Sequence, residues 1–227
     1  MKFPDVLRPD ASGLAFVGGD LAVETVCEAY VRRGLFPWCG GPRIPWFWPD
    51  PRAILIPSRF RVTRSLAKRA RTAGLRVAFD RDFAGAMLRC ATTVRTGEYN
   101  TWITPDMRDA YAELHRLGIA HSVEVYRDGT PVGGLYGLTF GRFFHGESMY
   151  HHERDTSKLA LWAMCQALDA RAFELVDCQV MTPHLASLGA EDVPRPVYMA
   201  RLAANAARPS LHASWAAWQV PCLPPLE

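Results

Sequence analysis

The chain has 227 residues, 49% of them hydrophobic and 22% charged, which is enough apolar material for one large domain or a large and a small one. The formal net charge of +3 is too small to indicate a partner by itself. We expect neither a targeting segment nor a membrane span, because no apolar run approaches the ~20 residues that a transmembrane helix needs. The six cysteines lack the short paired spacings of zinc sites, so we expect reduced thiols in a cytoplasmic protein without metal or cofactor.

The N-terminal part predicts a small separate unit. Asp20 is placed to cap a helix over residues 21–33, and Gly34 is placed to end it. The segment "LFPWCGGPRIPWFWPDPR", residues 35–52, is too rich in proline and glycine for a regular helix. It predicts a rigid, aromatic-lined loop at a junction, and hence a small domain over 1–52 and a larger one over 53–227.

The remainder alternates between strand and helix patterns. The predicted strands are 53–56, 75–79, an antiparallel set within 121–149 that turns at Asp128-Gly129, and 175–180. The predicted helices are 63–73, 83–90, 104–117, 157–169, 184–188 and 196–206. Mixed strands with helices between them favour a layered α/β or α+β domain.

The strand "LVDCQV", residues 175–180, carries a carboxylate and an amide in an otherwise apolar run. Regular alternation places Asp177 and Gln179 on one face and Cys178 on the other. The polar pair is either a structural hydrogen bond within the sheet or part of a catalytic site. By the same alternation Cys178 is a small buried hydrophobe, which argues against a thiol nucleophile.

A second carboxylate, Glu147 in "FFHGESM", follows a strand that should be largely buried. It either points to water or lies at the mouth of a pocket. His151, His152 and Glu153 come next, but adjacent histidines project in different directions, so a surface loop is favoured over a metal site.

Basic and aromatic residues suggest contact with nucleic acid. Arg64, Lys68 and Arg71 are spaced to line one helix face in a stretch that holds no acid. This face is either simply solvated or a contact for phosphates. Trp38 and Trp102 lie in loop-like sequence, where an exposed indole can stack on an unpaired RNA base.

Several motifs occur together in order: "FVGGDL" (16–21), "GLFPW" (34–38), "WPDPRAIL" (48–55), "TWIT" (101–104), "AHSVEVY" (120–126), "VGGLYG" (132–137), "GESM" (146–149), "SKLAL" (157–161) and "DCQV" with "HLASLGA" (177–190). Over nearly its whole length the chain resembles the leucyl/phenylalanyl-tRNA–protein transferase family. The resemblance implies an α+β chain: a small N-terminal domain before a GNAT-like acyltransferase domain, with a mixed, largely antiparallel sheet flanked by helices.

The resemblance also implies a function. It implies transfer of Leu or Phe, and less well Met, from aminoacyl-tRNA to proteins or peptides that begin with Arg or Lys, which marks them for N-degron degradation. The implied site has four parts: Trp38 and Trp102 for the 3′-terminal adenosine; Leu135, Phe144, Leu161 and Val176 for the amino-acid pocket; Glu147, Asp177 and Gln179 for catalysis; and Arg64, Lys68 and Arg71 for the tRNA.

The chain also departs from the family. It has one residue more between Tyr30 and Gly34 than the family usually shows, and "WFW" (46–48) stands where "WWS" is common. Leu135 occupies a pocket position filled elsewhere by Met, and the segment "YHHERD" (150–155) is unusually charged. A paralogue that uses another acceptor therefore remains an alternative interpretation.

The aminoacyl ester is already activated, so the enzyme mainly has to position an amine against the carbonyl carbon. In the mechanism that we expect, Asp177 holds the side-chain amide of Gln179, whose carbonyl then aims the amine. An acetyl-CoA-dependent acetyltransferase is disfavoured because the glycine-rich run that cradles a pyrophosphate is missing. A non-catalytic RNA-binding module would need the basic helix and the tryptophans but not the three polar residues.

Overall fold

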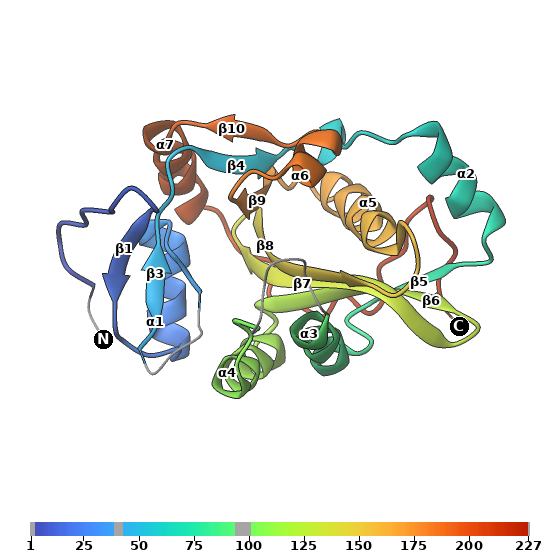
Figure 1. Cartoon of the computed structure of the whole chain (residues 1–227), viewed down its shortest axis with the longest axis horizontal. Helices are drawn as coiled ribbons and strands as arrows, with labels where there is room; N and C mark the ends of the chain where they lie inside the picture. Colours follow the sequence, from blue (N-terminus) through green and yellow to red (C-terminus); the bar gives the residue numbers. More distant parts are fainter. Residues whose placement is uncertain (1–2, 39–42, 94–100, 227) are drawn as a thin grey trace.

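The computed structural model describes residues 3–38, 43–93 and 101–226, which form two sheets with helices packed around them (Figure 1). The small sheet has the strand order β1-β3-β2 and is antiparallel. Its strands are β1 (Leu14–Val17), β2 (Phe36–Pro37) and β3 (Pro45–Phe47). The prediction of a loop over 35–52 is therefore wrong where β2 and β3 form, and residues 39–42 of that range lie outside the described residues. Proline fits because β2 is an edge strand and Pro45 is the first residue of β3.

The single helix predicted over 21–33 is in fact two pieces. The α-helix α1 (Val23–Glu28) continues into the π-helical turn η1 (Ala29–Arg33), and Gly34 closes it with a φ of 66°. A π-turn takes one more residue per turn than an α-helix. Such a turn would accommodate the additional residue expected between Tyr30 and Gly34, which stays a prediction. Asp20 does not cap α1; it accepts hydrogen bonds from the Ala22 amide and the Thr25 hydroxyl.

The large sheet has seven strands in the order β10-β4-β9-β8-β7-β6-β5. They are β4 (Arg52–Leu55), β5 (Arg76–Phe79), β6 (Ala120–Arg127), β7 (Thr130–Phe140), β8 (Phe143–His151), β9 (Leu175–Gln179) and β10 (Glu191–Val193). Neighbours are antiparallel except β8 and β9, which are parallel and joined through helix α5 (Thr156–Asp169). The predicted α+β class with a mixed, largely antiparallel sheet is confirmed; the three-residue strand β10 was not predicted.

Helices cover both faces of this sheet. Helix α2 (Arg64–Thr72) and α5 share one apolar cluster, whereas α3 (Phe83–Thr92) and α4 (Pro105–Arg116) belong to another on the opposite face (Figure 1). The remaining helices are the one-turn η2 (Pro57–Arg59), α6 (Pro183–Ser187) and α7 (Arg195–Ala206). Thr63 and Thr104, at which two of the predicted helices begin, cap α2 and α4, since each accepts a hydrogen bond from the amide three residues later.

The apolar core is continuous across the predicted domain boundary. The cluster that holds α3 and α4 also contains Val26, Tyr30 and Trp46 from the N-terminal part. The boundary at residue 52 stays a prediction, but the two parts share a core. Within the described residues, none of the helices is both long and apolar enough to cross a bilayer.

A buried ion pair ties the N-terminal part to the sheet. The Arg52 guanidinium, 1% exposed, donates to both carboxylate oxygens of Asp177, at 2.8 and 2.7 Å. Its remaining nitrogen donates to the Gly34 carbonyl, at 3.1 Å, at the end of η1. One side chain therefore joins β4, β9 and the π-turn.

Replacing Arg52 by methionine should destabilise the fold strongly. Removing one partner of a buried pair leaves an uncompensated charge, at a cost of about 3–5 kcal/mol. For a chain of this length that lowers the Tm by roughly 10 °C in calorimetry. Arg154→Met, at an exposed arginine, is the control and should leave the Tm unchanged. An unchanged Tm for Arg52→Met would contradict this account of the pair.

Candidate active site

The candidate site forms where the parallel strands β8 and β9 separate. They pair at three positions, the last between His145 and Asp177. Beyond this point each strand carries a β-bulge, with Glu147 as the extra residue in β8 and Cys178 as the extra residue in β9. A bulge re-aims the side chains around it. Here the two bulges turn a carboxyl and an amide into the space between the strands.

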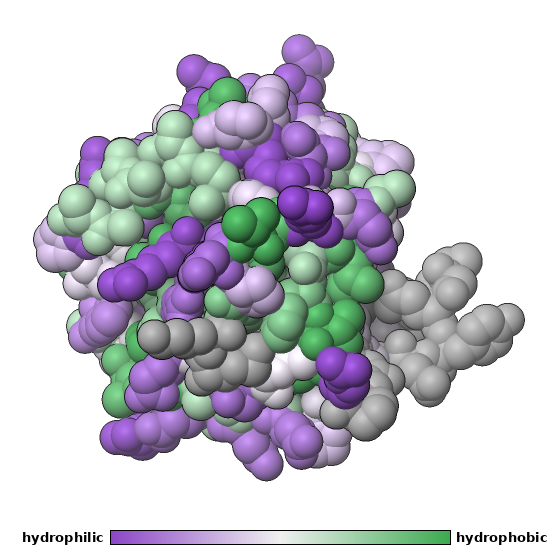
Figure 2. All heavy atoms as spheres, turned by 90° about the vertical axis from the view of Figure 1, so that its left-hand side faces the viewer, coloured by the Kyte–Doolittle hydropathy of each residue, from purple (hydrophilic) through white to green (hydrophobic). Residues whose placement is uncertain are grey.

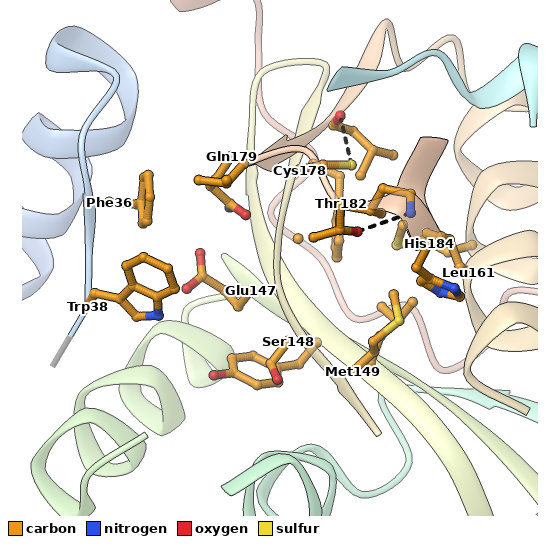
Figure 3. Close-up of a pocket in the computed structure, with 18 of the residues that line it drawn as sticks. Phe36, Trp38, Glu147, Ser148, Met149, Leu161, Cys178, Gln179, Thr182 and His184 are labelled. Atoms are coloured by element: carbon orange, nitrogen blue, oxygen red, sulfur yellow. Dashed lines mark hydrogen bonds between the residues drawn. The ribbon is translucent and has the colours of Figure 1, made fainter. Parts of the chain in front are cut away.

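That space is a cavity of about 440 Å³ (Figure 3). All four predicted pocket residues, Leu135, Phe144, Leu161 and Val176, line it. Sequence reasoning did not identify several further lining residues, including Met149, Met164, Cys178, Thr182, His184 and Leu185. The volume lies within the usual range for small-molecule sites, and the lining is mostly apolar.

Aromatic side chains line another part of the cavity. Trp38 and Trp102 both line it, and Trp38 is 41% exposed. Phe47 packs edge-on against Trp38, with ring centroids 5.3 Å apart. Figure 3 shows Phe36 and Trp38 on the same side of the cavity as Glu147 and Gln179. The adenosine-binding role of the two tryptophans stays a prediction.

Glu147 is held by two tyrosines. One carboxylate oxygen accepts a hydrogen bond of 2.6 Å from Tyr30, and the other accepts one of 3.2 Å from Tyr111. Burial raises the pKa of Glu147 to about 7, although the two tyrosine bonds favour the charged form. A carboxyl that ionises near neutral pH at a cavity wall can accept or donate a proton.

The predicted alternation of Asp177 and Gln179 is wrong. Gln179 lines the cavity together with Val176 and Cys178, whereas Asp177 is fully buried on the other side of β9. The cause is the bulge at Cys178 together with Gln179 itself, whose φ is 60°. This left-handed conformation is costly for a residue with a side chain and persists only where its surroundings enforce it.

Asp177 supports Gln179 through the backbone rather than through its side-chain amide. The Gln179 N–H donates to Asp177 at 3.0 Å. The two carboxylate oxygens also accept from Arg52, from His145 at 2.9 Å and from Tyr198 at 2.8 Å. With five donors on two oxygens, the carboxylate has little capacity left for the amide.

These contacts keep Asp177 charged. Burial alone would raise its pKa, but the charge of Arg52 and the hydrogen bonds from His145 and Arg52 outweigh burial and hold the pKa well below its usual range. Asp177 is therefore a fixed anion, whereas Glu147 on the neighbouring strand changes charge near neutral pH.

Cys178 lies in the cavity wall, contrary to the prediction that it faces away from Gln179. Burial, and secondarily the charge of Asp177, raises the pKa of its thiol. Because the thiolate is the nucleophilic form, this environment still argues against a thiol mechanism.

The supporting residues Tyr30, Arg52, Tyr111, His145 and Tyr198 were not identified from the sequence. Each lies far along the chain from its partner or, as with His145 in "FFHGESM", has the pattern of an ordinary strand residue. In the described part of the chain, no group of three or more His, Cys, Asp or Glu residues is placed to hold a metal. Glu153 instead pairs with Arg69 and Arg127.

The predicted basic face is exposed on α2. Arg64, Lys68 and Arg71 point to solvent, while Leu66 and Ala70 are buried. The helix lies far from the small N-terminal sheet, on the side of α5 (Figure 1). Its contact with tRNA stays a prediction.

Comparisons with known proteins decide the family. The family model described as "Leucyl/phenylalanyl-tRNA protein transferase" matches residues 54–203. The chain belongs to this family. It is 48% identical over 216 residues to the "Leucyl/phenylalanyl-tRNA--protein transferase" of Dechloromonas aromatica (strain RCB), covering 94% of this chain and 92% of that one. It is likewise 48% identical to the protein of that name from Thiobacillus denitrificans, covering 91% and 90%.

Solved structures give weaker likenesses. A GCN5-related N-acetyltransferase from Kribbella flavida has a TM-score of 0.39 and 15% identity, covering 64% of this chain and 54% of that one. The C-terminal domain of a putative lysylphosphatidylglycerol synthetase from Agrobacterium fabrum has a TM-score of 0.45 and 10% identity, covering 71% and 60%. At these scores the likenesses carry no argument about function.

Proposed function

We propose that the protein transfers an amino acid from aminoacyl-tRNA to the N-terminal amine of a protein. The observation that carries the proposal is the cavity itself. An apolar wall ends at Glu147 and Gln179, which two adjacent bulges turn toward the same space. The apolar side chain of the transferred amino acid would pack against this wall, while the ester carbonyl of the same amino acid reaches the polar end.

The donor is proposed to bind in three parts. Leu135, Phe144, Leu161 and Val176 take a leucine, phenylalanine or methionine side chain, and apolar fit excludes charged ones. Trp38 and Trp102 stack on the 3′-terminal adenosine. Arg64, Lys68 and Arg71 contact phosphates of the tRNA, which would make binding depend on salt.

The proposed chemistry is attack of an amine on an ester. The neutral α-amine forms a bond to the carbonyl carbon, and the bond from that carbon to the ribose 3′ oxygen breaks. Glu147 in its charged form accepts the proton that the amine loses, and that proton ends on the departing 3′ oxygen. The positioning of amine and ester supplies most of the acceleration, on the order of 7–11 kcal/mol at best.

Gln179 is proposed to aim the amine through its side-chain carbonyl. Asp177 is a positioning residue in this scheme, since it holds the Gln179 backbone in its left-handed conformation. The charged form of Glu147 at the cavity wall would favour a cationic acceptor, whereas the charge of Asp177 is balanced by Arg52.

We infer that the acceptors are proteins that begin with Arg or Lys, that transfer marks them for N-degron degradation, and that the enzyme works in the cytoplasm, where aminoacyl-tRNA is made. Membership of the family supports these inferences. A related transferase with a peptide or small-molecule acceptor is the alternative, since residues 150–155 are unusually charged.

The direct test is transfer of labelled Phe, Leu and Met from tRNA to peptides that differ only in their first residue. We expect incorporation only into peptides that begin with Arg or Lys. Incorporation from acetyl-CoA but not from aminoacyl-tRNA would contradict the proposed donor. Incorporation into some other acceptor alone would favour the alternative.

Two variants separate chemistry from binding in the same assay. Gln179→Ala should lower the transfer rate while the affinity for aminoacyl-tRNA stays near normal. Trp102→Ala should weaken donor binding by about 1–3 kcal/mol, the usual loss of one stacked base. If Gln179→Ala instead weakened donor binding and Trp102→Ala lowered only the transfer rate, the proposed roles of Gln179 and Trp102 would be reversed.

The rate should depend on the ionisation of Glu147. The pKa of about 7 predicts that kcat rises with pH through neutrality, because only the charged carboxylate accepts the proton. The acceptor amine, with an ordinary pKa of about 7.7–8.0, adds a second rise. Plots of log rate against pH should therefore approach a slope of about two in acid for the native protein, and about one for Glu147→Gln. An unchanged slope in the variant would exclude Glu147 as the base.

A further inference from the structure

The N-terminal segment and α4 each send one tyrosine hydroxyl to the candidate base. Tyr30 comes from the π-turn η1 and Tyr111 from α4, and both rings are fully buried. The two hydroxyl oxygens are also 3.2 Å apart, but each phenol has a single proton, so while both donate to the carboxylate neither donates to the other.

These two hydrogen bonds leave the Glu147 side chain little freedom. Its backbone is fixed by the bulge in β8, and each carboxylate oxygen has its own tyrosine donor. The phenol of Tyr30 keeps its proton, because burial and then the charge of Glu147 raise the pKa of Tyr30 well above the usual value. Tyr30 therefore remains a donor throughout the pH range in which Glu147 ionises.

We propose that Tyr30 and Tyr111 are positioning residues that orient the Glu147 carboxylate toward the attacking amine, which makes the N-terminal π-turn a part of the catalytic apparatus. The inference rests on the proposed function of Glu147 as proton acceptor. It adds that residues from η1 and α4, outside the β8–β9 pair, set both the orientation and the proton affinity of the Glu147 carboxylate.

The same hydroxyls oppose the effect of burial. The groups that face Glu147 are Tyr30 and Tyr111, which favour its charged form by hydrogen bonding, Asp177, which disfavours it, and Arg52, which favours it. Removing one hydroxyl leaves burial less opposed, so the carboxyl should hold its proton to higher pH. A residue that only fills space would not change this ionisation.

The test compares Tyr30→Phe and Tyr111→Phe with a matched control, Tyr126→Phe, on strand β6 and outside this group of hydrogen bonds. The pKa of the Glu147 carboxyl is followed by carbon-13 NMR of protein labelled at the glutamate carboxyls, with the resonance assigned by its loss in Glu147→Gln. We expect Tyr30→Phe to make Glu147 about tenfold weaker as an acid, with its pKa raised accordingly. Tyr111→Phe, which removes the longer bond, should raise the pKa by less, and Tyr126→Phe should leave it unchanged.

Transfer assays give the second readout. A Glu147 carboxyl that is tenfold weaker as an acid should transfer about tenfold more slowly at pH 6, because a tenfold smaller fraction of it is charged. The rate should recover toward the native rate above pH 8, with an unchanged KM for aminoacyl-tRNA. If both variants keep the native Glu147 pKa, the inference is wrong. Should Tyr30→Phe fail to fold, as judged by circular dichroism, the Tyr111→Phe titration decides the question.

The two readouts separate this inference from the proposed function. A native protein that transfers Phe but whose tyrosine variants keep the native Glu147 pKa refutes the tyrosine role alone. A native protein that transfers nothing, although its Glu147 pKa changes in the variants, refutes the proposed function but not the effect of the two tyrosines on Glu147.

Discussion

The buried pair between Arg52 and Asp177 is the interaction on which the rest of the site depends. A buried pair of this kind gains little net stability compared with well-packed apolar residues, because both charges lose their water. Its value here is geometric. The charged Asp177 carboxylate holds the Gln179 backbone in a conformation that a glutamine rarely adopts, and Arg52 links that carboxylate to the end of the N-terminal π-turn.

The two bulges place the carboxylates of Asp177 and Glu147 in different environments. The bulge in β9 leaves Asp177 buried on the side of β9 away from the cavity, where its hydrogen-bond donors and Arg52 keep it charged. The bulge in β8 leaves Glu147 at the cavity wall, where burial moves its ionisation toward neutral pH (Figure 3). Figure 2 faces the left-hand side of Figure 1 and shows apolar residues gathered between polar ones on that side of the molecule. The cavity offers a mostly apolar lining with few polar groups, which suits a substrate that is apolar at one end and reactive at the other.

Much of this could be predicted from the sequence. Local patterns were enough for the antiparallel set β6–β8 and for α2 and α4 with their threonine caps, whereas the resemblance supplied the α+β class and the four apolar residues that line the cavity. The facing of Asp177 and Gln179 could not be predicted, because alternation assumes a regular strand and a bulge is not evident from composition. Tyr30, Arg52 and Tyr198 were missed because their roles arise from contacts between distant segments.

The central claim is that the apolar cavity and the polar end made by Glu147 and Gln179 are one substrate site. A crystal structure with a non-hydrolysable 3′-amide analogue of phenylalanyl-adenosine tests it most directly. The account predicts that the phenyl ring packs against Leu161 and Val176. The carbonyl carbon should face Glu147 and Gln179, so that an acceptor amine held by these two side chains would lie within about 3.5 Å of it. An analogue bound with its phenyl ring outside the cavity, or with its carbonyl turned away from both polar side chains, would contradict it.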